Sequence, residues 1–161
     1  VLQVLGLAWV QTRVPRFGML IAKRDFAGLD VLWRHTALVA IGVFALGMGA
    51  FLLFQMMLNY FDIEFARRLV GTELTVLLLP TGLLALWVQC AATYWRAHKA
   101  EPLGFSAAIP GLINGALVWW LGMNYGAAGA IAAYLLMLAL ISTPLSLYLK
   151  YKVTHAYRAG F

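Results

Sequence analysis

Charged side chains are scarce along this chain. Only 11% of its 161 residues are Asp, Glu, Lys or Arg, whereas 63% are hydrophobic, and the mean hydropathy is +0.84. Soluble globular domains carry roughly 25% charged residues. The composition therefore argues against a soluble domain and predicts a membrane protein.

The chain also has only one cysteine and no recognisable catalytic motif. The single cysteine, Cys90, lies in an apolar run, which excludes a disulfide framework and predicts a buried, unreactive thiol. The sequence contains no nucleotide-binding loop and no nucleophile beside a base, and its three histidines, His35, His98 and His155, are far apart. We therefore expect no catalytic residue, no metal site and no cofactor, and we expect that the protein is not an enzyme.

Two long runs near the C-terminal end contain no Asp, Glu, Lys or Arg. They are Leu103–Met123 and Ala127–Leu149, and only three residues separate them. Each run has about 21 to 23 residues, enough for a helix to cross the roughly 30 Å hydrocarbon core of a bilayer. Because lipid offers no partner to a free backbone N–H or C=O, we expect an antiparallel helical hairpin that turns at 124–126.

Two further apolar runs precede the hairpin, so the sequence predicts four complete spans, at about residues 37–60, 74–95, 103–123 and 127–149. Residues 1–10 are apolar but too short to span. We interpret them as the end of a preceding helix and expect the sequence to be part of a longer chain. The predicted fold class is all-α: a polytopic membrane helical bundle that forms one unit over residues 1–161.

Glycines at short spacing predict where other helices come close. Gly111 and Gly115 have small-xxx-small spacing in the third predicted span, and Gly42, Gly47 and Gly49 lie in the first. Small residues let helix backbones approach one another in membranes.

Residues 11–36 form a basic segment, with apolar residues at helical spacing on both sides of a break. Asp25 is predicted to cap the second helix, because a carboxylate accepts hydrogen bonds from the free N–H groups at a helix start. We interpret the segment as amphipathic helix at the cytoplasmic membrane surface, continuing into the first span. It can act as an anchor on anionic lipid or as a site for an anionic headgroup.

The distribution of cations predicts the orientation. Ten of the twelve lysines and arginines lie before the first predicted span, between the second and third, or after the fourth; Arg67 and Arg68 lie between the first and second. Cytoplasmic loops carry the excess of Lys and Arg, so we expect both ends of the chain in the cytoplasm. The expected location is the cell membrane, as a multi-pass protein.

Two groups of polar residues are candidate substrate-binding residues. Cations at about headgroup depth can bind phosphate, whereas amides inside the spans can bind a hydroxyl-rich substrate or simply bond neighbouring helices. Both interpretations of the amides stay open. The candidates are Arg13, Arg16, Lys23 and Arg24 among the cations, and Gln55, Asn59, Gln89 and Asn114 among the amides.

The segment VPRFGMLIAKRDFAGLDVLWR resembles a segment of polysaccharide flippases, in which a Pro-containing helix end precedes a small residue, a basic or Gly position, Asp and a further helix. These positions are Pro15, Ala22, Lys23, Arg24 and Asp25 here, and the family has Gly where this chain has Arg24. The turn NYGAAGAIAAYLL resembles the Tyr-Gly-x-x-Gly-Ala hairpin of the same proteins. They belong to the multidrug/oligosaccharidyl-lipid/polysaccharide flippase superfamily.

This resemblance implies the C-terminal bundle of a two-lobed transporter that moves a lipid-linked oligosaccharide, as in O-antigen or other lipopolysaccharide synthesis, to the outer leaflet by alternating access. The implied partners are the lipid bilayer, the lipid-linked oligosaccharide and an N-terminal lobe of the same chain; we expect no nucleic acid. Two alternatives stay open, a multidrug or ion-coupled exporter of the same superfamily and a membrane enzyme acting on lipid-linked sugars.

Overall fold

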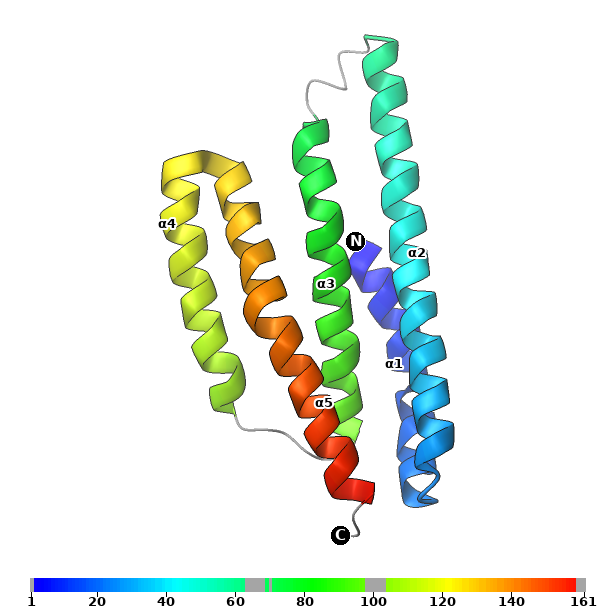
Figure 1. The fold of residues 1–161 in the computed structure, drawn as a ribbon. Coiled ribbons are helices and arrows are strands. Elements are labelled where there is room, and N and C mark those ends of the chain that lie inside the picture. Colours follow the sequence, from blue (N-terminus) through cyan, green and yellow to red (C-terminus); the bar gives the residue numbers. More distant parts are fainter. Residues whose placement is uncertain (1, 63–68, 70, 98–103, 159–161) are drawn as a thin grey trace.

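The computed structural model of the chain describes residues 2–62, 69, 71–97 and 104–158. Every regular element within these residues is a helix, which confirms the all-α prediction. In chain order they are α1 (Leu2–Ala22), α2 (Phe26–Tyr60), α3 (Thr72–Ala97), α4 (Gly104–Met137), the π-helical turn η2 (Leu138–Ser142) and α5 (Thr143–Arg158) (Figure 1).

Among the residues that the structure describes, three helical runs are long and apolar enough to cross a membrane: α2, α3 and Pro110–Lys152. The last run comprises most of α4, all of η2 and the first part of α5. With 35 residues, α2 is about 52 Å long, well above the roughly 30 Å of a hydrocarbon core. These helices are compatible with the predicted membrane bundle. The count of four complete spans stays a prediction.

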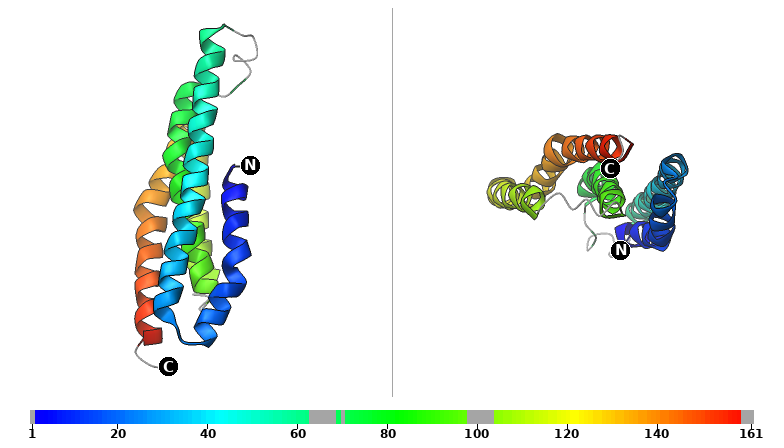
Figure 2. Two further views of the ribbon diagram at one scale, coloured as in Figure 1. Left: turned by 90° about the vertical axis from the view of Figure 1, so that its right-hand side faces the viewer. Right: turned by 90° about the horizontal axis from the view of Figure 1, so that it is seen from below.

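The third run turns back on itself inside α4. Gly126 has φ 64° and ψ −148°, a conformation that glycine adopts without the steric penalty of a Cβ. The two arms of α4 then lie side by side (Figures 1 and 2). A Cβ at Gly129 would collide with the backbone oxygen of Leu121 and with Cβ of Tyr125. The hairpin expected at residues 124–126 is thus present, and Gly129 lets its arms approach.

The basic segment predicted at residues 11–36 is divided between two helices. Its first half completes α1, which continues through Pro15, and its second half begins α2. Helix α1 packs against α2 and α3 and runs antiparallel to α2 (Figures 1 and 2). Phe17 in the first half and Leu29 in the second are buried, so both halves contribute apolar residues to a common core.

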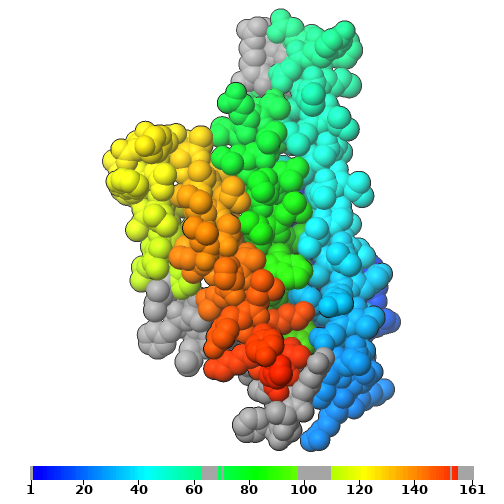
Figure 3. Space-filling model, in the orientation of Figure 1, coloured from blue at the N-terminus to red at the C-terminus, as the bar shows by residue number. Residues whose placement is uncertain are grey.

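The hydrophobic core lies between α1, α2 and α3. Its buried members include Phe17, Leu29, Ala40, Leu86 and Tyr94. By contrast, large apolar side chains cover the outer surface of α2, where Leu38, Leu46 and Leu53 are 68%, 77% and 69% exposed. Apolar exposure on this scale is unfavourable in water but suits contact with lipid. Figure 3 shows α5 and the second arm of α4 along α3, with the first arm of α4 outermost.

Most of the glycines predicted to lie at contacts between helices do not lie at such contacts in the described residues. A Cβ at Gly42, Gly49, Gly111 or Gly115 would meet no atom within 4 Å among the contacts that the structure describes. Gly47 does approach another helix, since a Cβ there would lie 2.7 Å from Cδ2 of Leu2. Gly82, which the spacing rule does not select, leaves room for the ring of Phe44. The expected contact faces at Gly111 and Gly115 are therefore absent from the described fold.

Candidate functional site

The turn between α1 and α2 positions two of the predicted cations, Lys23 and Arg24. The Asp25 N–H donates to the Leu20 carbonyl at 3.0 Å and the Arg24 N–H donates to the Ile21 carbonyl at 3.0 Å. This is the hydrogen-bond pattern that closes a helix with one left-handed residue, and Arg24 has φ 56°. The Lys23 and Arg24 side chains are exposed. The turn thus holds two cations at one end of the bundle.

Asp25 begins α2, as predicted. Its Oδ1 accepts a hydrogen bond from the Gly28 N–H at 2.9 Å, and this satisfies one of the free N–H groups in the first turn of the helix. A Cβ at Gly28 would collide with the same carboxylate. The cap and the left-handed Arg24 together make the reversal between the two helices tight.

The other two predicted cations lie on α1 and differ in their surroundings. The guanidinium carbon of Arg13 lies 4.6 Å from the centroid of the Trp9 ring, a cation–π contact between residues one helical turn apart. Arg16 is exposed. Arg13 is therefore held by an aromatic neighbour, whereas the head group of Arg16 points to the surroundings of the protein.

Two predicted amides lie near the far end of α2. Gln55 is buried, and the Nδ2 group of Asn59 donates to Oγ1 of Thr72 at 3.3 Å. The second contact joins the end of α2 to the first residue of α3. For Asn59, the structure therefore provides the helix-to-helix bond that was one of the two interpretations of the amides.

The remaining amides occupy different helices. Gln89 on α3 is exposed. Asn114, on the first arm of α4, has a buried Oδ1 with no hydrogen-bond partner in the described part of the chain. A buried amide oxygen without a partner costs roughly 1–3 kcal/mol. The Asn114 oxygen can thus accept a hydrogen bond from a further molecule.

Four buried hydroxyl groups are satisfied within their own helices. Thr36, Thr81 and Thr93 each donate to a carbonyl four residues earlier in their own helix, at 2.7, 2.9 and 2.9 Å. Ser146 donates to the Thr143 carbonyl at 2.7 Å. Such bonds satisfy the hydroxyl locally, so these four groups need no substrate.

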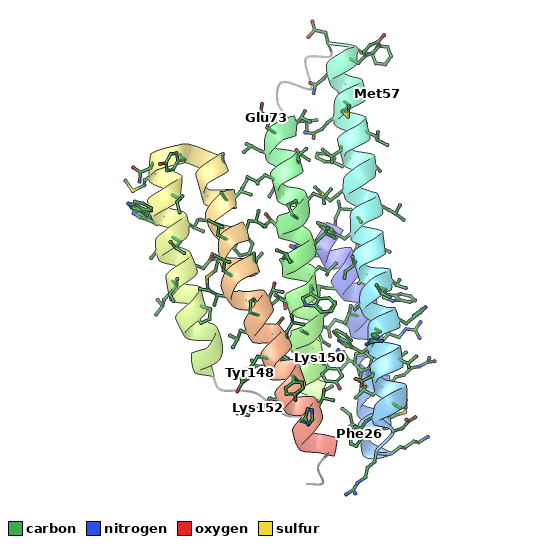
Figure 4. All side chains as sticks on the ribbon, viewed as in Figure 1. Phe26, Met57, Glu73, Tyr148, Lys150 and Lys152 are labelled. Carbon is green, nitrogen blue, oxygen red and sulfur yellow. The ribbon has the colours of Figure 1, made fainter. Side chains whose placement is uncertain are left out.

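The eight predicted residues do not converge on one place. Lys23 and Arg24 lie just before α2, near Phe26, whereas Gln55 and Asn59 flank Met57 at the opposite end of the same helix (Figure 4). At about 1.5 Å of rise per residue, the start of α2 and Asn59 are roughly 50 Å apart. A single headgroup cannot contact both groups at once.

A second cluster of polar and aromatic side chains joins three helices at the cationic end. We call Asp30, Trp33, Tyr94 and Lys150 the Lys150 cluster. The ammonium group of Lys150, on α5, lies 3.4 Å from the centroid of the Trp33 ring and 5.3 Å from that of Tyr94. The Tyr94 hydroxyl donates to Oδ1 of Asp30 at 3.0 Å. A partly desolvated ammonium on an aromatic face contributes about 1–2 kcal/mol.

Sequence reasoning missed this cluster. Trp33 and Tyr94 are aromatic residues near the ends of apolar runs, the usual place for side chains at the membrane interface, and Lys150 follows a span as a topology signal would. The spacing of Asp30 and Trp33, three residues apart on one helical face, was a local signal. Their meeting with Lys150 depends on how α5 packs along α3, and spacing does not carry that information.

Comparison with known protein families, with curated proteins and with solved structures finds no match. Across the residues that the structure describes, no group of three or more His, Cys, Asp or Glu side chains could hold a metal ion. The site must therefore be interpreted from its own chemistry, which is that of exposed cations at one end of an apolar bundle.

Proposed function

We propose that this chain is the C-terminal part of a membrane flippase that moves lipid-linked oligosaccharides or polysaccharide precursors across the cell membrane by alternating access. In this proposal the lipid tail stays in the bilayer, and cations at the headgroup plane bind the phosphate groups of the substrate. An N-terminal lobe of the same protein supplies the opposite wall of the path.

The gathering of cations at one end of the apolar bundle carries the proposal. The turn before α2, the end of α3 and the last turns of α5 lie at the same end (Figure 1). The exposed cations there come from three separate parts of the sequence: the segment with Arg16, Lys23, Arg24 and Arg34, the end of α3 with Arg96, and α5 with Lys152. Such a concentration of positive charge at one membrane surface favours anionic headgroups.

Two backbone features support the likeness to polysaccharide flippases. Arg24 adopts φ 56° at the position where the family has glycine, so the turn has the shape that a glycine would favour. Gly126 adopts φ 64° in the Tyr-Gly hairpin that resembles the family motif. Both observations concern the backbone and are independent of the charge distribution.

Arginine is the better candidate for phosphate binding, because its planar guanidinium offers two parallel N–H donors to phosphate oxygens and lysine cannot reproduce this fork. Arg16 is exposed, whereas Arg13 already stacks on Trp9. We therefore expect Arg16 to make the main phosphate contact, with Arg13 as the other candidate.

The test replaces Arg13 and Arg16 singly by Lys in the full-length protein and measures export of the lipid-linked sugar. Each change keeps the charge and hence the topology. We expect Arg16→Lys to reduce export roughly tenfold, equivalent to about 1.4 kcal/mol for a lost charged hydrogen bond, with normal membrane insertion. Arg96→Lys, at an exposed position at the end of α3, is the matched control. Full export by both variants would contradict phosphate binding by these arginines.

A further inference from the structure

The Lys150 cluster connects α5 to α2, although α5 packs mainly against α3. Helix α5 packs along α3, and its Lys150 side chain extends past Tyr94 to the ring of Trp33 on α2. Lys150 lies on the side of α5 toward α2, whereas Tyr148 and Lys152 lie on its outer side (Figure 4). One flexible side chain therefore ties the last helix to the core formed by the first three.

The Trp33 ring, which contacts the Lys150 ammonium, is held in place by contacts of its own. The Trp33 indole N–H donates to the backbone carbonyl of Cys90 at 3.0 Å, and its ring meets those of Trp87 and Tyr94 edge-on, at centroid distances of 5.4 and 5.7 Å. Trp33 and Tyr94 are both buried in the core. None of these contacts involves Lys150, so they orient the indole independently of the ammonium.

Charges of both signs lie near the Lys150 ammonium. The Asp30 carboxylate attracts the Lys150 ammonium, and the nearby Arg34 guanidinium repels it. Lys150 is half-buried, at intermediate exposure, so it has lost part of its hydration. This loss of hydration offsets part of the attraction between the ammonium and the Asp30 carboxylate.

A break in the helix lies between the hairpin and Lys150. In η2 the hydrogen bonds widen to the π pattern, and the Thr143 N–H donates to the Leu138 carbonyl five residues earlier. Pro144 follows and has no N–H to offer. The buried Oγ1 of Thr143 has no hydrogen-bond partner in the described part of the chain. Helices bend at such places.

We propose that the Lys150 cluster is a releasable latch and that η2 is the hinge about which α5 moves when the latch opens. With the ammonium on Trp33, α5 is held against α2 and α3. With the ammonium released, the segment after Pro144 moves away while the hairpin stays in place. This inference goes beyond the proposed function, because it rests on contacts within this chain and holds for any substrate.

The test measures spin-label distances in the full-length protein with Cys90 replaced by Ala. One label pair, at Val31 on α2 and Tyr148 on α5, reports the segment after the hinge; both side chains are exposed. A second pair, at exposed Val76 on α3 and exposed Leu136 on α4, reports the segment before it. Lys150→Met removes the ammonium, Lys150→Arg keeps a cation, and Lys152→Met is the matched control at a neighbouring exposed lysine.

We expect Lys150→Met to add a second, longer population for the Val31–Tyr148 pair, shifted on the order of 5 Å, about one helical turn. The Val76–Leu136 pair should keep one population. Lys150→Arg and Lys152→Met should match the unchanged protein. Asp30→Asn, which is isosteric, should also add the longer population. This variant replaces Lys150→Met in the test if Lys150→Met does not fold. An unchanged Val31–Tyr148 distance in the folded variants, or equal changes in both pairs, would overturn the latch.

Discussion

At the residue scale, the backbone of Arg24 determines the turn between α1 and α2. Its φ of 56° is a left-handed conformation, which costs roughly 1–2 kcal/mol for a residue with a Cβ and little for glycine. We expect Arg24→Gly to raise the free energy of unfolding by about 1 kcal/mol, measured by thermal or denaturant unfolding in detergent. The side chain is exposed, so no packing is lost.

Arg24→Ala provides the control, because it removes the same charge but keeps the Cβ. We expect this variant to unfold at the same free energy as the unchanged protein. Equal stabilisation by Gly and Ala would assign the effect to relief of charge repulsion with Lys23 instead of backbone strain.

Residues whose roles depend on their immediate neighbours could be predicted from the sequence. Asp25 is an example, since a helix cap involves only the next three residues, and its bond to the Gly28 N–H confirms it. Lys150 is the opposite case. Its partners, Asp30, Trp33 and Tyr94, come from two other helices, so its role requires knowledge of how those helices pack.

At the scale of elements, Gly129 controls the hairpin within α4. We expect Gly129→Ala to lower the free energy of unfolding by roughly 1–3 kcal/mol, as for overpacking elsewhere, because the added methyl meets backbone atoms of Leu121 and cannot move aside. Gly115→Ala on the first arm meets no described atom within 4 Å and should be neutral or stabilising by up to about 1 kcal/mol. Unfolding in detergent measures both. A stability loss as large for Gly115→Ala would indicate a partner surface on that arm.

The elements themselves were predictable because length, apolarity and short connections act locally. The hairpin, the helix after Asp25 and the runs of α2 and α3 all follow from these properties. The glycines that make contacts were not predictable, because such contacts are not local. Small-xxx-small spacing marks a helix face that another helix can approach, and only the packing decides whether a neighbour lies there. Gly82 contacts Phe44 although it belongs to no such pair.

At the scale of the whole molecule, the distribution of Lys and Arg along the sequence predicts the orientation in the membrane. We expect Asn124→Cys, at the exposed hairpin turn, to react with a membrane-impermeant thiol reagent added outside intact cells, and Lys152→Cys, at the cationic end, to react only after the cells are opened. The native Cys90 is fully buried, at 0% exposure, and gives little background. The reverse labelling pattern would place the cations outside and remove the proposed phosphate site from the cytoplasmic surface. Labelling of both positions from outside would instead show that the second arm of α4 and α5 together do not cross the membrane, which would reduce the number of spans below four.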